Sequence, residues 1–198
     1  VSVSNAGLNT HDGIYKGGQR LVNEIRDTVK ELTGLTKISM IGFSLGGLYC
    51  RCAAAILYDD ASKSIAGLTP VNFITLGSPH LGIRNLVPFG DLGGFVTGTL
   101  FRETGKELFL LDGPAPEQSL LCRMTKDEDH LYLTSLCSFK HRLLYAYVCS
   151  DFKVKFQTAA MCLYHQPLPT SSPPDPRRYP HLTGDTRVHL RWVEPDDG

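Results

Sequence analysis

Four stretches of the chain have hydrophobic patterns that indicate regular secondary structure. Along residues 19–32 the apolar side chains recur at helical spacing, and Gly34 follows at the position of a C-cap. Short apolar runs at 37–43, 71–76 and 142–149 are instead typical of buried strands. These patterns predict one amphipathic helix and three strands of a common sheet.

Further helices are expected between and after the strands. Residues 46–58 are mostly small and apolar, 120–136 has helical spacing in pieces, and 156–164 is expected to form a short helix. Because strands that alternate with helices form parallel sheets with right-handed crossovers, the sequence predicts an α/β fold. Residues 1–3 and 188–193 are weaker candidates for strands.

Composition divides the chain into three parts. Residues 1–165 are expected to form a partial α/β core, interrupted at about 84–118 by an apolar, glycine-punctuated excursion that resembles a cap. Residues 166–186 are predicted to be a loop because prolines are concentrated there, and 187–198 to hold a last strand and a tail. The remaining polar stretches, which we expect to be connections rich in turns, are 5–18 and 59–70.

The strand at 37–43 runs directly into a Gly-x-Ser-x-Gly motif, Gly42-Phe43-Ser44-Leu45-Gly46. A strand, this motif and a following helix are typical of the nucleophile elbow of serine hydrolases, in which a tight turn lifts the Ser hydroxyl above the edge of the sheet. The turn strains its central residue, and side chains at Gly42 and Gly46 are expected to clash. The alternative is a glycine-rich turn with an incidental Ser.

Charge and composition exclude several classes of protein. The 198-residue chain has 20 basic and 20 acidic residues, so its charge does not point to a nucleic-acid partner. No apolar run approaches the roughly 20 residues of a transmembrane helix, which leaves peripheral contact with a membrane open. The six cysteines lack the spacing of a zinc site, and we expect mostly free, buried thiols. We therefore expect an intracellular, cytoplasmic protein without a cofactor or metal.

A serine nucleophile needs a base and a carboxylate that orients the base, in the chain order Ser, Asp or Glu, His. Ligand sites of parallel sheets lie at the carboxyl ends of the strands, which favours Asp151, directly after the strand at 142–149. Asp112, Asp127 and Asp129 are interpreted as solvated carboxylates. No histidine fits the base, because those before Asp151 have the wrong order and those after it lie too close to it or precede the end of the last strand candidate: His11, His80, His130 and His141, then His165, His181 and His189.

The oxyanion of an acyl-transfer reaction needs hydrogen-bond donors. One is expected to be the backbone N–H of Leu45, the residue after the nucleophile. The second normally belongs to a loop after an earlier strand, often in a His-Gly context, and no such loop precedes residue 37. Phe43 and His80 are candidates for lining the site, although a structural hydrogen bond explains His80 equally well.

Several segments, in this order along the chain, are similar to a known family: 9–14 with 17–21, 44–51, 72–82, 105–112 and 139–142. They resemble the putative serine esterase family, a lipase-like group of eukaryotic α/β-hydrolases, and its plant-type members especially. The resemblance implies an α/β-hydrolase fold and hydrolysis of acyl esters, lipids above all. It also implies that Ser44 is the nucleophile and Asp151 the acid.

Two departures from the family concern the active site. Phe43 stands where many members carry His before the nucleophile. In addition, the family's oxyanion-loop strand lies upstream of Val1 and its catalytic His lies downstream of Gly198. The chain is therefore expected to be an internal piece of a longer protein, with a sheet truncated at both ends.

Two hypotheses for the function follow. In the first, the full-length protein is a serine acyl hydrolase, and the excursion at 84–118 forms the wall or cap that binds acyl groups; plain core packing explains that excursion equally well. In the second, the chain is a catalytically inactive interaction domain that keeps the fold but lacks the base. In either case we expect the isolated chain to have little or no esterase activity and a sheet edge that tends to associate.

Overall fold

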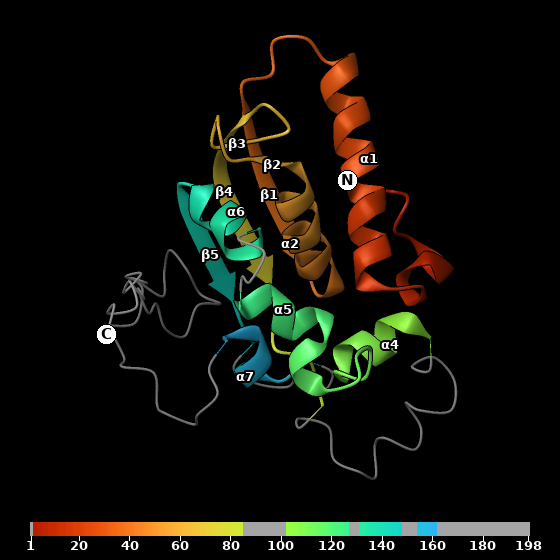
Figure 1. Cartoon of the computed structure of the whole chain (residues 1–198). Coiled ribbons are helices and arrows are strands. Elements are labelled where there is room, and N and C mark those ends of the chain that lie inside the picture. The colour runs from red at the N-terminus through yellow and green to blue at the C-terminus, as the bar shows by residue number, and fades with distance from the viewer. Residues whose placement is uncertain (1, 85–101, 127–130, 148–153, 162–198) are drawn as a thin grey trace, which may run out of the picture. The chain divides into compact units, whose positions relative to one another are not determined.

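The computed structural model describes residues 2–84, 102–126, 131–147 and 154–161, all within the first of two units of the chain, Val1–Leu163 (Figure 1). Helices and strands follow one another in the described part much as the sequence predicts. In chain order the elements are η1 (Gly7–His11), α1 (Ile14–Glu31), β1 (Lys37–Phe43), α2 (Leu45–Leu57), β2 (Tyr58–Asp59), β3 (Ser64–Ile65), β4 (Thr69–Leu76), α4 (Glu103–Leu108), η2 (Pro116–Gln118), α5 (Leu120–Lys126), α6 (Tyr132–Ser138), β5 (His141–Tyr145) and α7 (Phe156–Ala159).

The main sheet has three parallel strands in the order β1-β4-β5. Phe43 pairs with Leu76, and Leu76 pairs with Tyr145, so the carboxyl ends of all three strands lie at one edge. Parallel neighbours need a crossover connection, and α2 lies in the connection between β1 and β4. The predicted α/β fold, with a mostly parallel sheet flanked by helices, is confirmed.

Two clusters of buried side chains hold the helices to the sheet and to one another. The first lies between α1, α2 and the sheet, where the rings of Phe73 and Phe139 meet edge-on with their centroids 5.3 Å apart. The second joins α1 and α2, which lie side by side in Figure 1, to α5 and α6. Its buried members are Ile14, Leu48, Tyr49, Cys52, Ala55, Leu120, Leu121, Met124 and Tyr132.

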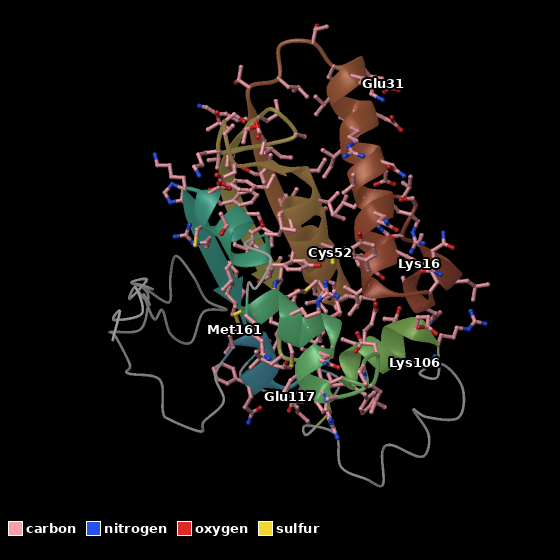
Figure 2. The ribbon with its side chains drawn as sticks, viewed as in Figure 1. Lys16, Glu31, Cys52, Lys106, Glu117 and Met161 are labelled. Carbon is pink, nitrogen blue, oxygen red and sulfur yellow. The ribbon has the colours of Figure 1, made fainter. Side chains whose placement is uncertain are left out.

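Two glycines allow α1 and α2 to approach closely. A Cβ atom on Gly17 would lie 2.2 Å from Cε1 of Tyr49, and one on Gly18 would lie 2.3 Å from Cβ of Cys52, which Figure 2 shows between the two helices. The turn-rich connection predicted for 5–18 is wrong in its last part, because α1 already begins at Ile14. Glycine lowers helix stability, but at these positions it admits a neighbour that any side chain would exclude.

Other predictions at the N-terminus and in the connections also differ from the structure. Ser2 and Val3 form no strand, and the N–H of Val3 instead donates to Oε1 of Glu24 on α1. The connection at 59–70 contains part of the short antiparallel hairpin β2–β3. The excursion at 84–118 includes the helices α4 and η2, while 85–101 lie outside the described residues.

The structure describes only part of the chain after residue 119. α5 and α6 confirm helices in pieces across 120–136, although α6 continues to Ser138, and α7 begins at Phe156 as expected but already ends at Ala159. β5 ends at Tyr145, and residues 148–149 of its predicted span lie outside the described residues, as do 166–186 and 187–198.

The cysteines follow the prediction in part. Cys50, Cys52, Cys122 and Cys137 are free thiols. The first two are buried in α2, Cys122 is half-buried, and Cys137 is exposed, so the expectation of burial is wrong for Cys137. Burial raises the pKa of Cys50 and of Cys52 to about 12, so both thiols stay protonated at neutral pH. Cys149 and Cys162 lie outside the described residues.

Candidate active site

Ser44 occupies the turn between β1 and α2, in a backbone conformation that residues with a side chain rarely adopt. Its φ is 50° and its ψ is −124°. The turn is held from both sides, because the N–H of Ser44 donates to the carbonyl of Leu76 on β4 (2.8 Å) and its carbonyl accepts from the N–H of Gly47 (3.1 Å). Strained backbone of this kind costs of order 1–3 kcal/mol and persists only where the surroundings enforce it. The local geometry is that of a nucleophile elbow.

The glycines around Ser44 have different roles from those expected. A Cβ on Gly42 would lie 2.4 Å from the Cα of Gly47, so Gly42 is required for the close approach of β1 to α2. A Cβ on Gly47 would lie 2.1 Å from Oγ of Ser78. At Gly46, by contrast, a Cβ would meet no atom within 4 Å, so the clash predicted for this residue is wrong. The second steric requirement lies one residue later, at Gly47.

The N-terminus of α2 faces the same turn. The first N–H groups of a helix have no partner within the helix, and the helix dipole makes its N-terminus favourable for negative charge. Here the N–H groups of Leu45 and Gly46 are in this position, directly after Ser44. The assignment of Leu45 as a donor to the oxyanion is consistent with this geometry and stays a prediction.

Phe43 and Ser44 differ in their exposure. The side chain of Phe43, which precedes the nucleophile, is 65% exposed, whereas Ser44 is half-buried. Because successive side chains of a strand point to opposite faces, Phe43 shares the uncovered face of β1 with Ile41. Its proposed contact with a substrate stays a prediction.

His80 is buried and polar contacts hold it in place. The residue is 1% exposed, and its Nε2 shares a hydrogen bond of 3.0 Å with Oγ1 of Thr75. Burial, with a smaller effect from the nearby Arg51, lowers the pKa of His80 to about 3. At neutral pH the ring is therefore uncharged, which matches the structural hydrogen bond considered for it from the sequence. A role in lining the site stays a prediction.

Of the other described histidines, His141 does not supply a base by position. His141 begins β5 and pairs with Asn72, whereas Ser44 follows the opposite, carboxyl ends of the strands. Four residues of strand separate these ends, or roughly 13 Å. His11 lies in η1, half-buried. The remaining histidines, His130, His165, His181 and His189, lie outside the described residues.

The predicted acid, Asp151, also lies outside the described residues. The strand that leads toward it does not, and Tyr145 at the described end of β5 pairs with Leu76, next to Phe43. The carboxyl ends of β1 and β5 therefore lie at the same end of the sheet. The assignment of Asp151 as the acid stays a prediction. Asp112, interpreted as solvated, is exposed and accepts a hydrogen bond of 2.8 Å from the N–H of Leu120.

Arg51 and Ser78 are residues beside the elbow that the sequence reasoning missed. Arg51 lies on α2 and is 1% exposed, and Ser78 is equally buried against Gly47. A signal for Arg51 was present, because a lone charged residue interrupts the otherwise apolar run at 48–57. Ser78 had no such signal, since its importance depends on contact with a glycine from another part of the chain.

In the described part of the chain, no group of three His, Cys, Asp or Glu side chains is arranged to hold a metal ion. The same residues include no helix that is long and apolar enough to cross a membrane.

A strained Ser between a parallel strand and the N-terminus of a helix is the geometry of the nucleophile elbows found in α/β-hydrolases. The chain belongs to the family described as "Putative serine esterase (DUF676)", which it matches over residues 1–163. The resemblance to the putative serine esterase family is thus confirmed.

Curated relatives from Saccharomyces cerevisiae are named putative lipases. The chain is 32% identical to "Putative lipase YDL109C" over 96% of its own length and 30% of that protein. It is also 32% identical to "Putative lipase YDR444W", over 80% of its length and 26% of that protein. The chain thus spans less than a third of these relatives. No solved structure matches it.

Proposed function

We propose that the protein is a serine acyl hydrolase that cleaves acyl esters of lipids through an acyl-enzyme on Ser44. The observation that carries this proposal is the backbone of Ser44, with φ 50° and ψ −124° at the junction of β1 and α2. A strained residue at a ligand-binding edge of a parallel sheet is a recurring feature of catalytic sites. The names of the yeast relatives support lipids as the substrate class.

In the proposed reaction, Ser44 Oγ attacks the ester carbonyl while a base takes its proton, and the alcohol leaves as it regains a proton from that base. The N–H of Leu45 donates to the oxyanion, favoured by the positive end of the α2 dipole. Water then hydrolyses the acyl-enzyme by the reverse sequence of proton transfers. Asp151 is the proposed orienting acid, and the base is a histidine that the described residues do not include.

The nucleophile is tested by labelling the full-length protein with a fluorophosphonate, which reacts with activated serines. The wild type and Ser39→Ala should be labelled, since Ser39 is an exposed hydroxyl on the same strand, whereas Ser44→Ala should not. Equal labelling of Ser44→Ala would refute the proposed acyl-enzyme. Loss of labelling in Asp151→Asn, with the fold retained, would support the proposed acid.

The lipid preference is tested separately with p-nitrophenyl esters of butyrate and laurate. We expect kcat/KM to increase with acyl length, and Phe43→Ser to lower the value for laurate more than for butyrate, because Phe43 exposes its ring beside the nucleophile. An ester preference that is flat or reversed would contradict the lipid assignment and leave the serine mechanism intact.

The second candidate is a catalytically inactive domain that binds a partner. It is favoured by the histidines of the described residues, because His80 is buried and neutral and His141 lies at the far end of β5. A folded full-length protein that reacts with no fluorophosphonate and turns over neither ester would support this function over the first.

A further inference from the structure

Arg51 is a buried cation that holds backbone carbonyls of two other segments. Its Nη2 donates to the carbonyl of Met124 on α5 (3.1 Å), and its Nη1 is 3.5 Å from the carbonyl of His80. Burial lowers the pKa of Arg51 to about 10, so the side chain is still charged at neutral pH. No carboxylate of the described ranges forms an ion pair with it. Arg51 therefore links α2, which starts at the elbow, to the turn after β4 and to α5.

Stability alone does not account for an arginine at this position. Taking a charge out of water is costly, so a buried charged group is weak evidence for a stabilising role. Arg51 Nε has no partner in the described part of the chain, so the residue does not even satisfy all its donors. A methionine would avoid the cost of burying a charge, although the carbonyls of His80 and Met124 would lose this donor.

The segment that Arg51 holds, residues 76–80, packs against the nucleophile elbow, and we call it the wall of the elbow. Leu76, at its start, accepts the hydrogen bond from the N–H of Ser44, and Ser78 fills the space next to Gly47. His80 is fixed by its ring to Thr75 and by its carbonyl to Arg51. The contacts from Leu76 to His80 therefore connect the guanidinium to the backbone of the nucleophile.

We propose that Arg51 is a positioning residue, which presses the turn at 77–82 against the elbow so that Ser44 keeps its reactive conformation. It acts through His80 and Ser78 and does not contact the reacting atoms. The inference rests on the proposed function, since it assigns a role in the reactivity of Ser44. Its cost in burial is offset by placement of the nucleophile, for which an error of about 1 Å can slow an enzyme about a hundredfold.

The test compares Arg51→Met and Arg51→Lys in the full-length protein, with Arg26→Met on the exposed face of α1 as the matched control. Arg51→Met should lower the melting temperature, because the carbonyls of His80 and Met124 lose their donor. Measured well below that temperature, the folded variant should react with the fluorophosphonate about tenfold to a hundredfold more slowly, and lose kcat in proportion with KM unchanged. Arg51→Lys should recover part of the rate, because an ammonium can still donate to one carbonyl. Arg26→Met should behave as the wild type.

A second variant keeps the test decisive if Arg51→Met fails to fold. Thr75→Val preserves shape but removes the hydrogen bond to His80, and should slow labelling in the same direction. Labelling and kcat at the wild-type level in folded Arg51→Met, or in folded Thr75→Val if the first variant does not fold, would overturn the proposal.

The backbone amide signals of residues 44–47 give a readout that does not depend on activity. We expect them to shift in Arg51→Met and not in Arg26→Met, and unshifted signals would also overturn the proposal. If even the wild type is not labelled while these signals shift, the proposed function has failed and the positioning contact has not.

Discussion

The side chain of Ser78 lies in the space that a methyl group on Gly47 would need, with its Oγ 2.1 Å from the position of that carbon. Gly47 is outside the Gly-x-Ser-x-Gly motif, yet it sets how closely α2 approaches the turn after β4. Gly46, inside the motif, faces open space. The two neighbouring glycines therefore allow a matched comparison.

We expect Gly47→Ala to destabilise the protein by about 1–3 kcal/mol, because overpacking forces the neighbouring backbone to shift. Gly46→Ala should be neutral or stabilise by up to about 1 kcal/mol, since alanine is the better helix former. Urea unfolding of both variants measures the difference. Similar losses of stability in the two would show that the contact with Ser78 is not what makes Gly47 necessary.

A buried carboxyl group caps the N-terminus of α1. Glu107 on α4 accepts a hydrogen bond from the N–H of Ile14, next to Thr104, which accepts from the N–H of Gly13 (2.9 Å). Burial, with smaller effects from Asp112 and other groups, raises the pKa of Glu107 to about 7, above its ordinary value of 4.5. The folded state therefore binds this proton more tightly than the unfolded state does.

The sign of the resulting pH effect follows from linkage. A carboxyl group with a raised pKa in the folded state contributes stability that is present below pH 4.5 and is lost as the pH rises through 7. We expect the free energy of unfolding of the wild type, relative to Glu107→Gln, to fall between pH 5 and pH 8. The exposed Glu117, labelled in Figure 2, provides the control variant Glu117→Gln. A pH-independent difference between wild type and Glu107→Gln would contradict this interpretation.

Arg20 fastens the N-terminal residues to α1. It donates to both carboxylate oxygens of Asp12 (2.7 and 2.8 Å), to Oδ1 of Asn5 and to the carbonyl of Asn9. The hydrogen bond with Arg20 holds the pKa of Asp12 below its ordinary value.

We expect Arg20→Lys to lose about 1 kcal/mol of stability, because an ammonium cannot reproduce the planar, two-pronged contact. Faster amide exchange at residues 4–13 should accompany this loss, and Arg26→Met should leave both measurements unchanged. Full retention of protection in Arg20→Lys would show that charge alone is sufficient.

One face of the sheet exposes apolar side chains. Ile41 and Phe43 are 66% and 65% exposed, and the register places them beside Ile74 and Leu76 of β4. On β5, Leu143 pairs with Ile74 and Tyr145 pairs with Leu76, so apolar residues lie side by side across all three strands. We expect the 198-residue chain to self-associate through this face, since exposed apolar patches favour association.

Phe43→Lys should shift that chain toward the monomer in sedimentation experiments. Leu32→Lys alters an exposed leucine after the end of α1 and should not. A monomeric wild-type chain at high micromolar concentration, or an equal effect of the two variants, would refute association through the sheet.

The predictability of the elbow differs from that of its surroundings for a physical reason. The order strand, turn and helix around Ser44 depends on local periodicity and on small residues, which are visible within the single continuous segment 37–57. The predicted start of the helix at residue 19 is wrong for the opposite reason. Gly17 and Gly18 are typical of turns, and their place in α1 depends on the close packing of Tyr49 and Cys52 against them. Local propensity is overruled where a distant segment fills the space.

The sequence by itself determined the α/β class, the alternation of parallel strands with helices, the strand–turn–helix at Ser44 and the family to which the chain belongs. These features follow from patterns within short segments, together with motifs in a constant order. Only the tertiary structure decided that Gly47 is the tight position, that His80 is buried and neutral, and that Arg51 holds the wall of the elbow. Such properties arise from burial and from contacts between residues up to 94 positions apart, as between Thr104 and Thr10, and no local pattern specifies them.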